Sequence, residues 1–211
     1  MTCEEHIQIS TGDLTIDKLN MFKANNWLGD GCINEYSRLL CQEHNNIHIF
    51  NTNFYKIFRQ LGYNHVISYT HNRRGYLNIF EKDLVFFPIF YNRHWMLIVY
   101  IVDKNKLIFI DSFRTPNTYH LEKAKQYLIL EERQHSQVNR AIDIQLIQLY
   151  DNPLQTNGVD CGVFVCLEIR YLAMLYNKAE EQNVSLLLQF SESECVYWRC
   201  NILKSILTNA I

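Results

Sequence analysis

The chain has 211 residues, 48% hydrophobic and 13% aromatic, which is typical of a folded globular protein and excludes a disordered one. Its net charge of −2 lacks the basic excess of nucleic-acid binders, and its longest apolar runs are too short to span a membrane. Seven cysteines without regular spacing, and an N-terminus without a secretory signal, favour a reducing location inside the cell, in the nucleus or cytoplasm. We expect a polar lead-in over residues 1–24 and one domain over residues 25–211.

Two helices are predicted in the first third of the chain. Apolar residues at helical spacing predict one that begins at Asp30 or Gly31. A second helix is predicted over residues 50–61 and ends at Gly62. Residues 70–75, which are polar and contain a glycine, are predicted to form a loop.

The middle of the chain is typical of a small sheet. Strands are predicted over residues 84–87, 95–102 and 107–110, and Pro88 is expected to end the first of them. Residues 103–106 supply the polar turn between the last two strands.

The remaining elements are mostly helical. A helix is predicted over residues 121–133, a strand over 142–149, a buried helix over 163–175 and a last helix over 197–209. Because helices, strands and helices follow one another in blocks, the order of the elements predicts a segregated α+β domain.

One cysteine stands where chemistry would require it. In the segment Q-T-N-G-V-D-C-G-V-F, Cys161 lies at the start of a buried helix, where the positive end of the helix dipole favours a nucleophilic thiolate. Gly158 and Gly162 allow a tight turn and the close approach of a substrate backbone. Gln155 can direct an amide N–H at the carbonyl under attack, or can merely cap a turn.

A cysteine hydrolase also needs an imidazole and a carboxylate that orients it. His94 precedes one predicted strand and Asp111 ends the next. A symmetric hairpin, however, places Asp111 opposite Ile98, four residues from His94, a separation of about 13 Å. The triad therefore requires a bulge, a strong twist or an asymmetric turn. Without it, Cys161 is a buried small side chain, His94 a core edge and Asp111 a strand-end cap.

Several segments, taken together and in this order, are similar to those of a known family. They are W-L-G-D-G-C-I-N-E-Y from Trp27, F-N-T-N-F-Y from Phe50, N-I-F-E-K-D-L-V-F-F-P-I from Asn78, R-H-W-M-L-I-V at His94, L-I-F-I-D-S-F at Asp111, Q-T-N-G-V-D-C-G-V-F at Cys161 and Q-F-S-E-S-E followed by Y-W-R at Arg199. From about residue 25 to residue 207 the chain resembles the SUMO-specific (sentrin-specific) proteases, a branch of the cysteine peptidases that process ubiquitin-like proteins. The resemblance implies a papain-like α+β fold, with a central mixed or antiparallel sheet flanked by helices.

The resemblance also implies the roles of the site residues. His94, Asp111 and Cys161 match the catalytic triad of the family, and Gln155 matches its oxyanion glutamine. The implied reaction is cleavage after the C-terminal Gly-Gly of a ubiquitin-like modifier, SUMO first among them, in a conjugate or in a precursor. The enzyme is expected to act as a monomer, with the modifier and its conjugates as partners, and to require no cofactor.

Three further residues match substrate-binding positions of the family. Trp27 and Trp95 match the two indoles that form a tunnel over the Gly-Gly tail, and Asp30 matches an acidic position on the surface that receives the modifier. The alternatives are plain core aromatics and a helix N-cap. Gly29 and Val159 depart from the family pattern, as does the longer loop with Arg73 and Arg74, and these departures leave the modifier preference open.

Other assignments remain to be separated from this one. The same chemistry fits ubiquitin, another ubiquitin-like protein or a viral polyprotein as substrate, and a related fold serves acetyltransferases. A catalytically inactive, modifier-binding module is the alternative of another class. Cys41, His44 and His48 lack a fourth ligand, so no metal site is expected.

Overall fold

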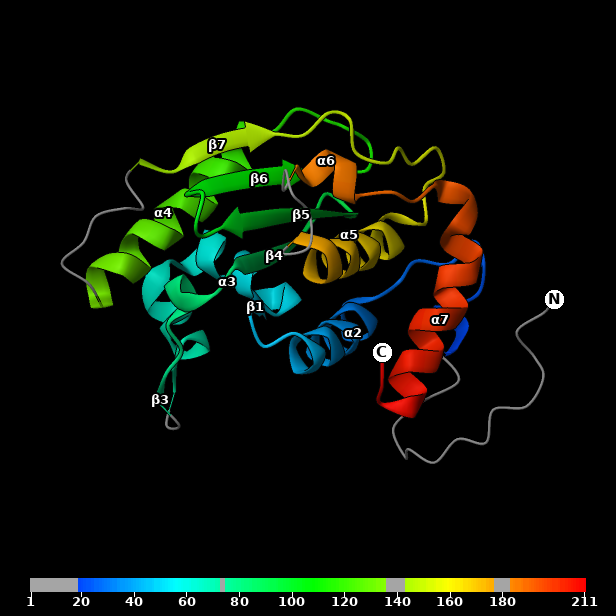
Figure 1. Cartoon of the computed structure of the whole chain (residues 1–211), viewed down its shortest axis with the longest axis horizontal. Helices are drawn as coiled ribbons and strands as arrows, with labels where there is room; N and C mark the ends of the chain where they lie inside the picture. Colours follow the sequence, from blue (N-terminus) through cyan, green and yellow to red (C-terminus); the bar gives the residue numbers. More distant parts are fainter. Residues whose placement is uncertain (1–18, 73–74, 136–142, 177–182) are drawn as a thin grey trace.

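The computed structural model describes residues 19–72, 75–135, 143–176 and 183–211. Most of the expected lead-in, and the loop residues Arg73 and Arg74, lie outside these ranges. Within them, five strands form one sheet in the order β1-β4-β5-β6-β7 (Figure 1). The strands are β1 (Ile47–Ile49), β4 (Leu84–Tyr91), β5 (His94–Ile101), β6 (Lys106–Ile110) and β7 (Gln145–Gln148). The two outer pairs are parallel and the two inner pairs antiparallel, which makes the sheet mixed.

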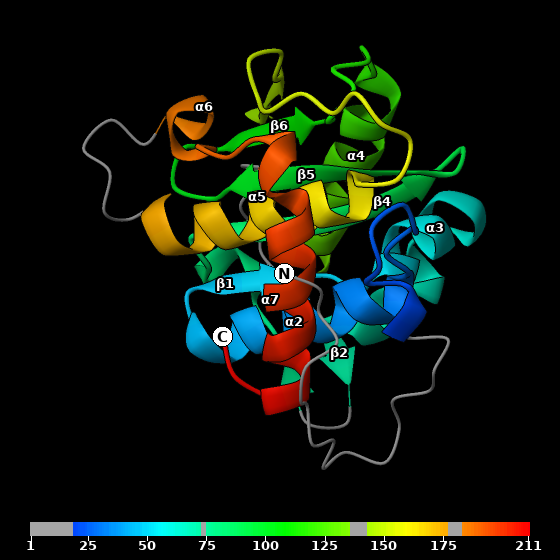
Figure 2. The ribbon, with the colours of Figure 1, turned by 90° about the vertical axis from the view of Figure 1, so that its right-hand side faces the viewer.

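Helices cover both faces of the sheet, which confirms the predicted α+β class (Figures 1 and 2). The helices of the described ranges are α2 (Asp30–Glu43), α3 (Thr52–Leu61), α4 (Thr118–His135), α5 (Cys161–Leu175), α6 (Val184–Leu187) and α7 (Cys195–Thr208). Helices α2, α5 and α7 pack together on one side, whereas α3 and α4 lie on the other.

Alternation along the central strands creates the two cores. In β5, Leu97 and Val99 face α5, whereas Ile98 and Tyr100 face α3 and α4. Because successive side chains of a strand point to opposite faces, a strand buried on both sides reads as one continuous apolar run. Such a strand holds its first residue, His94, in a fixed place at the rim of the sheet.

The prediction that Pro88 ends its strand is wrong, because β4 runs through it to Tyr91. The reason lies in the neighbouring strand. The carbonyl oxygen of Phe86 accepts a hydrogen bond from Phe50 N on the β1 side. Residue 88 lies two positions further along the strand, so an N–H there would point to the same side, and proline has none. Strand β1 has already ended there, at Ile49, so proline removes no ladder hydrogen bond.

Other differences from prediction are short elements. Strand β1 was not predicted, and a small hairpin of β2 (His71–Asn72) and β3 (Gly75–Tyr76) stands where a loop was expected. Both fall below the length at which an apolar pattern becomes visible. The start of α2 at Asp30 and the stop of α3 at Gly62, which has a φ of 85°, are confirmed.

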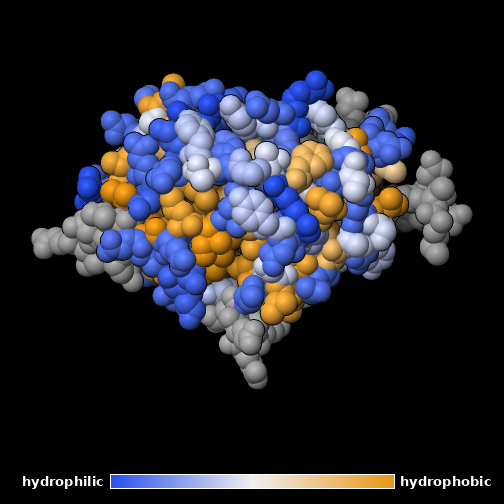
Figure 3. Space-filling view, turned by 90° about the horizontal axis from the view of Figure 1, so that it is seen from above, coloured by the Kyte–Doolittle hydropathy of each residue, from blue (hydrophilic) through white to orange (hydrophobic). Residues whose placement is uncertain are grey.

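Strand β7 forms one edge of the sheet. Figure 3 looks onto that edge and shows hydrophobic side chains gathered in a patch that hydrophilic ones surround. Leu146 and Ile147 of β7 are only partly buried against the two cores. None of the helices in the described ranges is long and apolar enough to cross a membrane.

Candidate active site

Cys161 is the first residue of α5, as predicted, and its N-cap is Asp160. The helix is apolar on almost every side and lies between the sheet and helices α2 and α7. A Cβ on Gly162 would come within 2.9 Å of Leu28 Cβ and 3.3 Å of Trp95 Cδ1. Glycine at this position therefore lets the start of α5 approach the tryptophan segment closely. Glycine is thus needed at position 162 for packing within the protein, whereas at Gly158 a Cβ would meet nothing within 4 Å.

The loop before Cys161 is held by side-chain acceptors. Asn157 Oδ1 accepts hydrogen bonds from the backbone N–H groups of Val159 and Asp160, which fixes the turn into the helix. Glu192, much later in the chain, accepts hydrogen bonds at its Oε1 from the backbone N–H groups of Thr156 and Asn157. Cys161 is thus placed by contacts that sequence spacing does not reveal.

The strongest of these contacts is a buried ion pair. Arg199 of α7 is only 1% exposed and donates two hydrogen bonds to Asp160 Oδ1, of 3.0 and 2.6 Å. It also donates to the carbonyl oxygens of Met21 and Val159. One guanidinium therefore ties the residue before the nucleophile to the last helix and to the start of the described chain. Sequence analysis missed it as a site residue.

His94 lies beside Asp111, as the triad requires. Its Nε2 is 2.6 Å from Asp111 Oδ1 and donates to that carboxylate. A two-residue turn sets the position of His94, because Asn92 and Arg93 both have positive φ, the geometry of a tight hairpin. A stacked Phe113 ring, with a centroid distance of 4.5 Å, supports the imidazole and was not predicted. Asp111 leaves the other ring nitrogen, Nδ1, unused, and the Cys161 thiol is a further partner that raises the pKa of His94.

A shift of the turn by one residue, not an asymmetry within it, shortens the separation that the expected hairpin would impose, since Ile101 pairs with Lys106 on either side of residues 102–105. Strand β6 pairs Ile110 with Leu97, so Asp111 follows opposite Met96 rather than Ile98. Asp111 is now two residues, or about 7 Å along a strand, from the level of His94, and the side chains of Asp111 and His94 span that distance. The turn begins one residue earlier than predicted, with Asn105 in the left-handed region at a φ of 51°.

The charges of the site favour a protonated His94. Burial of the imidazole alone would lower its pKa, but the hydrogen bonds with Asp111 and Cys161 outweigh burial and raise the pKa to about 9. Burial alone would raise the pKa of Asp111, but the hydrogen bond from His94 and those from Phe113 N and Thr115 N hold it below its usual value. An imidazolium between a carboxylate and a thiol can stabilise a thiolate.

These charges predict the alkaline limit of activity. The raised pKa means that His94 keeps its proton through neutral pH and loses it as the pH rises through about 9. Since the proton must reach a leaving group, kcat/KM is expected to fall on the alkaline side with an apparent pKa near that value. A pH profile of modifier hydrolysis measures it. An alkaline limb near 6.5, the ordinary histidine value, would contradict the predicted ion pair.

Gln155 is buried and held by two partners. Its Oε1 accepts a hydrogen bond from the Ser112 hydroxyl at 2.8 Å, and its Nε2 donates to Asn157 O at 2.7 Å. Nε2 also makes a longer contact of 3.4 Å with Asn157 Oδ1, so its second N–H is only weakly held. Ser112, which follows Asp111, therefore positions this amide, and sequence analysis did not single it out.

Trp27 and Trp95 line one hollow, of about 310 Å³, together with Asp30. Trp95 is buried at 6% exposure and donates to Leu28 O, whereas Trp27 is 40% exposed and donates to Gly158 O at 2.9 Å. The guanidinium of Arg93 lies 4.9 Å from the Trp27 ring centre. Trp27 therefore bridges the loop before Cys161 and the turn before His94.

Asp30 lies at the rim of this hollow and is exposed. It is the first residue of α2 and not its N-cap, which is Gly29, so the alternative of a helix N-cap is wrong. The Asp30 carboxylate accepts from Gly31 N at 2.8 Å, which stabilises the positive end of the helix.

Glu168 is a further buried group that the sequence did not bring to attention. It lies on α5, seven residues after Cys161, and burial raises its pKa to about 8, with a smaller contribution from the charge of Asp111. The carboxyl group is therefore mostly protonated at neutral pH and adds little negative charge near the imidazolium.

The chain matches the sequence model of the Ulp1 protease family, C-terminal catalytic domain, over residues 26–208. It is 32% identical over 209 residues to putative ubiquitin-like-specific protease 1B of Arabidopsis thaliana, which covers 92% of this chain and 58% of that protein. It is 30% identical over 179 residues to sentrin-specific protease 2 of Homo sapiens, which covers 79% of this chain and 28% of that protein. The chain thus spans only part of the length of these relatives.

Solved structures agree with the sequence match. The SUMO protease Ulp1 with its catalytic cysteine oxidised to a sulfinic acid superposes with a TM-score of 0.78 at 27% identity, covering 93% of this chain and 84% of that one. The C-terminal Ulp1 protease domain in complex with Smt3, the yeast ortholog of SUMO, also superposes with a TM-score of 0.78, at 26% identity. The match covers 93% of this chain and 83% of that one.

Proposed function

This chain belongs to the Ulp1 protease family, and we propose that it is a cysteine protease that cleaves after the C-terminal Gly-Gly of a ubiquitin-like modifier, SUMO first among them. The observation that carries the proposal is the contact of 2.6 Å between His94 Nε2 and Asp111 Oδ1, beside a cysteine that opens a buried helix. Within the described ranges, His94 and Asp111 are the only histidine and carboxylate within 4.0 Å of each other.

Acylation follows from this geometry. The Cys161 thiolate attacks the carbonyl carbon of the last glycine, and the negative charge moves to the carbonyl oxygen. The second amide N–H of Gln155, on leaving its long contact with Asn157 Oδ1, and the backbone N–H of Cys161 stabilise that oxyanion, and one such donor is worth roughly 10²–10³ in rate. The His94 imidazolium, held by Asp111, gives its proton to the departing amine as the C–N bond breaks. A thioester between the modifier and Cys161 remains.

Deacylation reverses the role of the imidazole. Neutral His94 takes a proton from water as the water oxygen attacks the thioester carbonyl. The C–S bond then breaks, which restores the thiolate beside the imidazolium and releases the modifier as a carboxylic acid, whose proton passes to solvent. Both half-reactions use the same nitrogen of His94, so the ring does not need to turn over.

The hollow lined by Trp27 and Trp95 supports recognition of a glycine tail. We propose that the two last glycines pass between these indoles, since a side chain there would collide with a ring. Asp30, exposed at the rim of the same hollow, is proposed to face a basic residue of the modifier. Residues 25–211 are proposed to form one catalytic domain that acts as a monomer inside the cell, where the free cysteines of the described ranges stay reduced.

The choice of modifier is tested by hydrolysis of matched substrates. SUMO and ubiquitin, each with a fluorogenic amide at the C-terminus, are compared at equal concentration under conditions that keep Cys161 reduced. We expect SUMO to be hydrolysed with the higher kcat/KM. Hydrolysis of ubiquitin alone would contradict the SUMO assignment but leave the protease assignment standing.

Substitution in the tail tests the role of the two tryptophans. Alanine in place of the penultimate glycine of the modifier is expected to lower kcat/KM by roughly tenfold or more, because its methyl group enters a space between rings. Trp27→Ala is expected to raise KM for the substrate with the glycine tail. It is also expected to narrow the difference in kcat/KM between the glycine tail and the alanine tail. A difference unchanged in Trp27→Ala would contradict the tunnel.

A further inference from the structure

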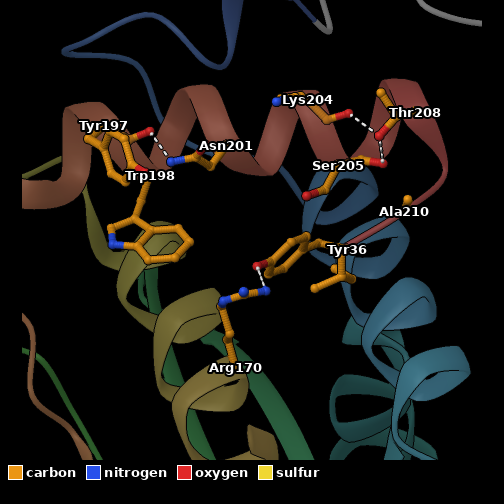
Figure 4. Close-up of a pocket in the computed structure, with 10 residues that line it drawn as sticks. Tyr36, Arg170, Tyr197, Trp198, Asn201, Lys204, Ser205, Thr208 and Ala210 are labelled. Atoms are coloured by element: carbon orange, nitrogen blue, oxygen red, sulfur yellow. Dashed lines mark hydrogen bonds between the residues drawn. The ribbon is translucent and has the colours of Figure 1, made fainter.

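A second hollow lies between helices α2, α5 and α7 (Figure 4). Its volume is about 380 Å³. Arg170 from α5 and Tyr36 from α2 contribute to one side, and Trp198 and Lys204 from α7 to the other. Arg170 follows Cys161 by nine residues on α5, about 14 Å along the helix axis, so this hollow is separate from the triad. We name it the α7 groove.

Arg170 brings a positive charge to the groove without a nearby acid. Its guanidinium lies 5.3 Å from the Trp198 ring centre and donates one hydrogen bond, of 3.3 Å, to the Tyr36 hydroxyl. Within the described ranges no carboxylate lies within 4.0 Å of it. Arg199 and Arg38, by contrast, are both paired with carboxylates. A guanidinium has five N–H donors, so most of those of Arg170 remain for a ligand.

The other polar groups of the groove are also donors. The Tyr36 hydroxyl accepts from Arg170, which leaves its own O–H to donate, and burial raises its pKa to about 12 and so keeps it protonated. Lys204 forms no ion pair with the described residues, and Ser205 of the same helix also lines the groove (Figure 4). Among the described residues, no aspartate or glutamate lines the groove, and Glu43 affects Tyr36 only through its charge.

Two positive charges and several donors around one hollow define the ligand. We propose that the α7 groove binds a phosphate monoester, carried by a small molecule or by a phosphorylated side chain. A phosphate monoester has a charge of about −1.5 to −2 at pH 7, which matches Arg170 and Lys204, and its three oxygens use more donors than a carboxylate can. The groove volume lies in the range of small-molecule sites, so the aromatic rings of Tyr197 and Trp198 leave room for the group that the phosphate esterifies.

The test is a titration of the whole chain at constant ionic strength, in which binding is measured by calorimetry and by the NMR chemical shifts of the backbone amides. Inorganic phosphate and phenyl phosphate are the probes, and phenol and chloride are the controls. We expect saturable binding of both phosphates, tighter for phenyl phosphate, with the largest shifts in α7. Adenosine monophosphate and a phosphoserine peptide are then compared. The one that binds more tightly shows whether the phosphate is carried by a small molecule or by a phosphorylated side chain.

Variants decide whether the groove is the binding site. Two variants, Lys204→Met at an exposed position and Arg170→Met, are each expected to lower the affinity for phenyl phosphate roughly ten- to a hundredfold. This is the usual contribution of a charge-assisted hydrogen bond. Lys123→Met, on α4 across the sheet, is the matched control and should leave the affinity unchanged. No saturable response to either phosphate, or equal affinity in Lys204→Met and the native chain, would overturn the proposal.

Discussion

Asparagine in place of Asp111 is expected to lower kcat/KM by roughly 10²- to 10⁴-fold, the range for acid–base catalysis by an oriented imidazole. The carboxylate accepts three hydrogen bonds, from His94 Nε2, Phe113 N and Thr115 N. An asparagine side chain has a single acceptor oxygen, so its NH₂ group must face at least one of these donors. The proton of His94 is then no longer held on Nε2, and the pKa of the imidazole falls from about 9 because the negative charge is lost.

Asp103→Asn is the matched control for this variant. Asp103 lies in the turn at the other end of the same strand pair, where it contacts Lys104 and Tyr176 in an exposed setting. Its substitution should change kcat/KM by less than about twofold. The pH profile adds a second readout, since the alkaline limb of Asp111→Asn should move to lower pH. A loss of less than about tenfold, with an unmoved limb, would show that Asp111 does not orient the base.

Methionine in place of Arg199 is expected to destabilise the fold by about 3–5 kcal/mol, the cost of leaving one member of a buried ion pair without its partner. Asp160 would lose its counter-ion, and the carbonyl oxygens of Met21 and Val159 would lose a donor. For a chain of this size the loss corresponds to a fall in Tm of about 6–20 °C. Thermal and urea unfolding measure it.

Arg38→Met provides the comparison for Arg199→Met. Arg38 is also a helical arginine and has an N–O distance of 2.7 Å to Glu35, but both side chains are about 40% exposed. An exposed pair is worth about 0–1 kcal/mol, so the two variants should differ severalfold in their effect. Equal effects would mean that burial of the Arg199–Asp160 pair does not matter to the fold.

The sequence was sufficient to predict the helices and the nature of the site but not the register that assembles it. Cys161 at a helix start, His94 before a strand and Asp111 after one all follow from local patterns. Their meeting depends on a turn that begins one residue earlier than its polar composition suggests. Composition marks where a turn lies, but the side-chain packing of two whole strands decides the register.

Proline shows the same limit of local reasoning. Pro88 was expected to end a strand because it lacks an N–H, and in isolation that expectation is sound. Whether the missing donor matters depends on the length of a neighbouring strand from elsewhere in the chain, here β1, which ends at Ile49. No pattern within residues 84–91 contains that information.

Residues that support the site were missed for a related reason. Arg199 and Asp160 are 39 positions apart, and Ser112 and Gln155 are 43 apart, so nothing in their spacing pairs them. A signal did exist for Arg199, because a single arginine stands among apolar residues of the last helix. A charge on a buried helix face demands a partner, and the acidic residue before the nucleophile was a candidate.

We propose above all that Cys161 forms a covalent bond to the C-terminal glycine of a modifier. The most direct measurement is incubation with SUMO and with ubiquitin that carry an electrophile at the C-terminus, followed by intact mass and peptide mapping. We predict an adduct with SUMO, of one modifier per chain and attached at Cys161, and none in Cys161→Ala. An adduct that persists in Cys161→Ala, or no adduct with any modifier in the native chain, would contradict the account.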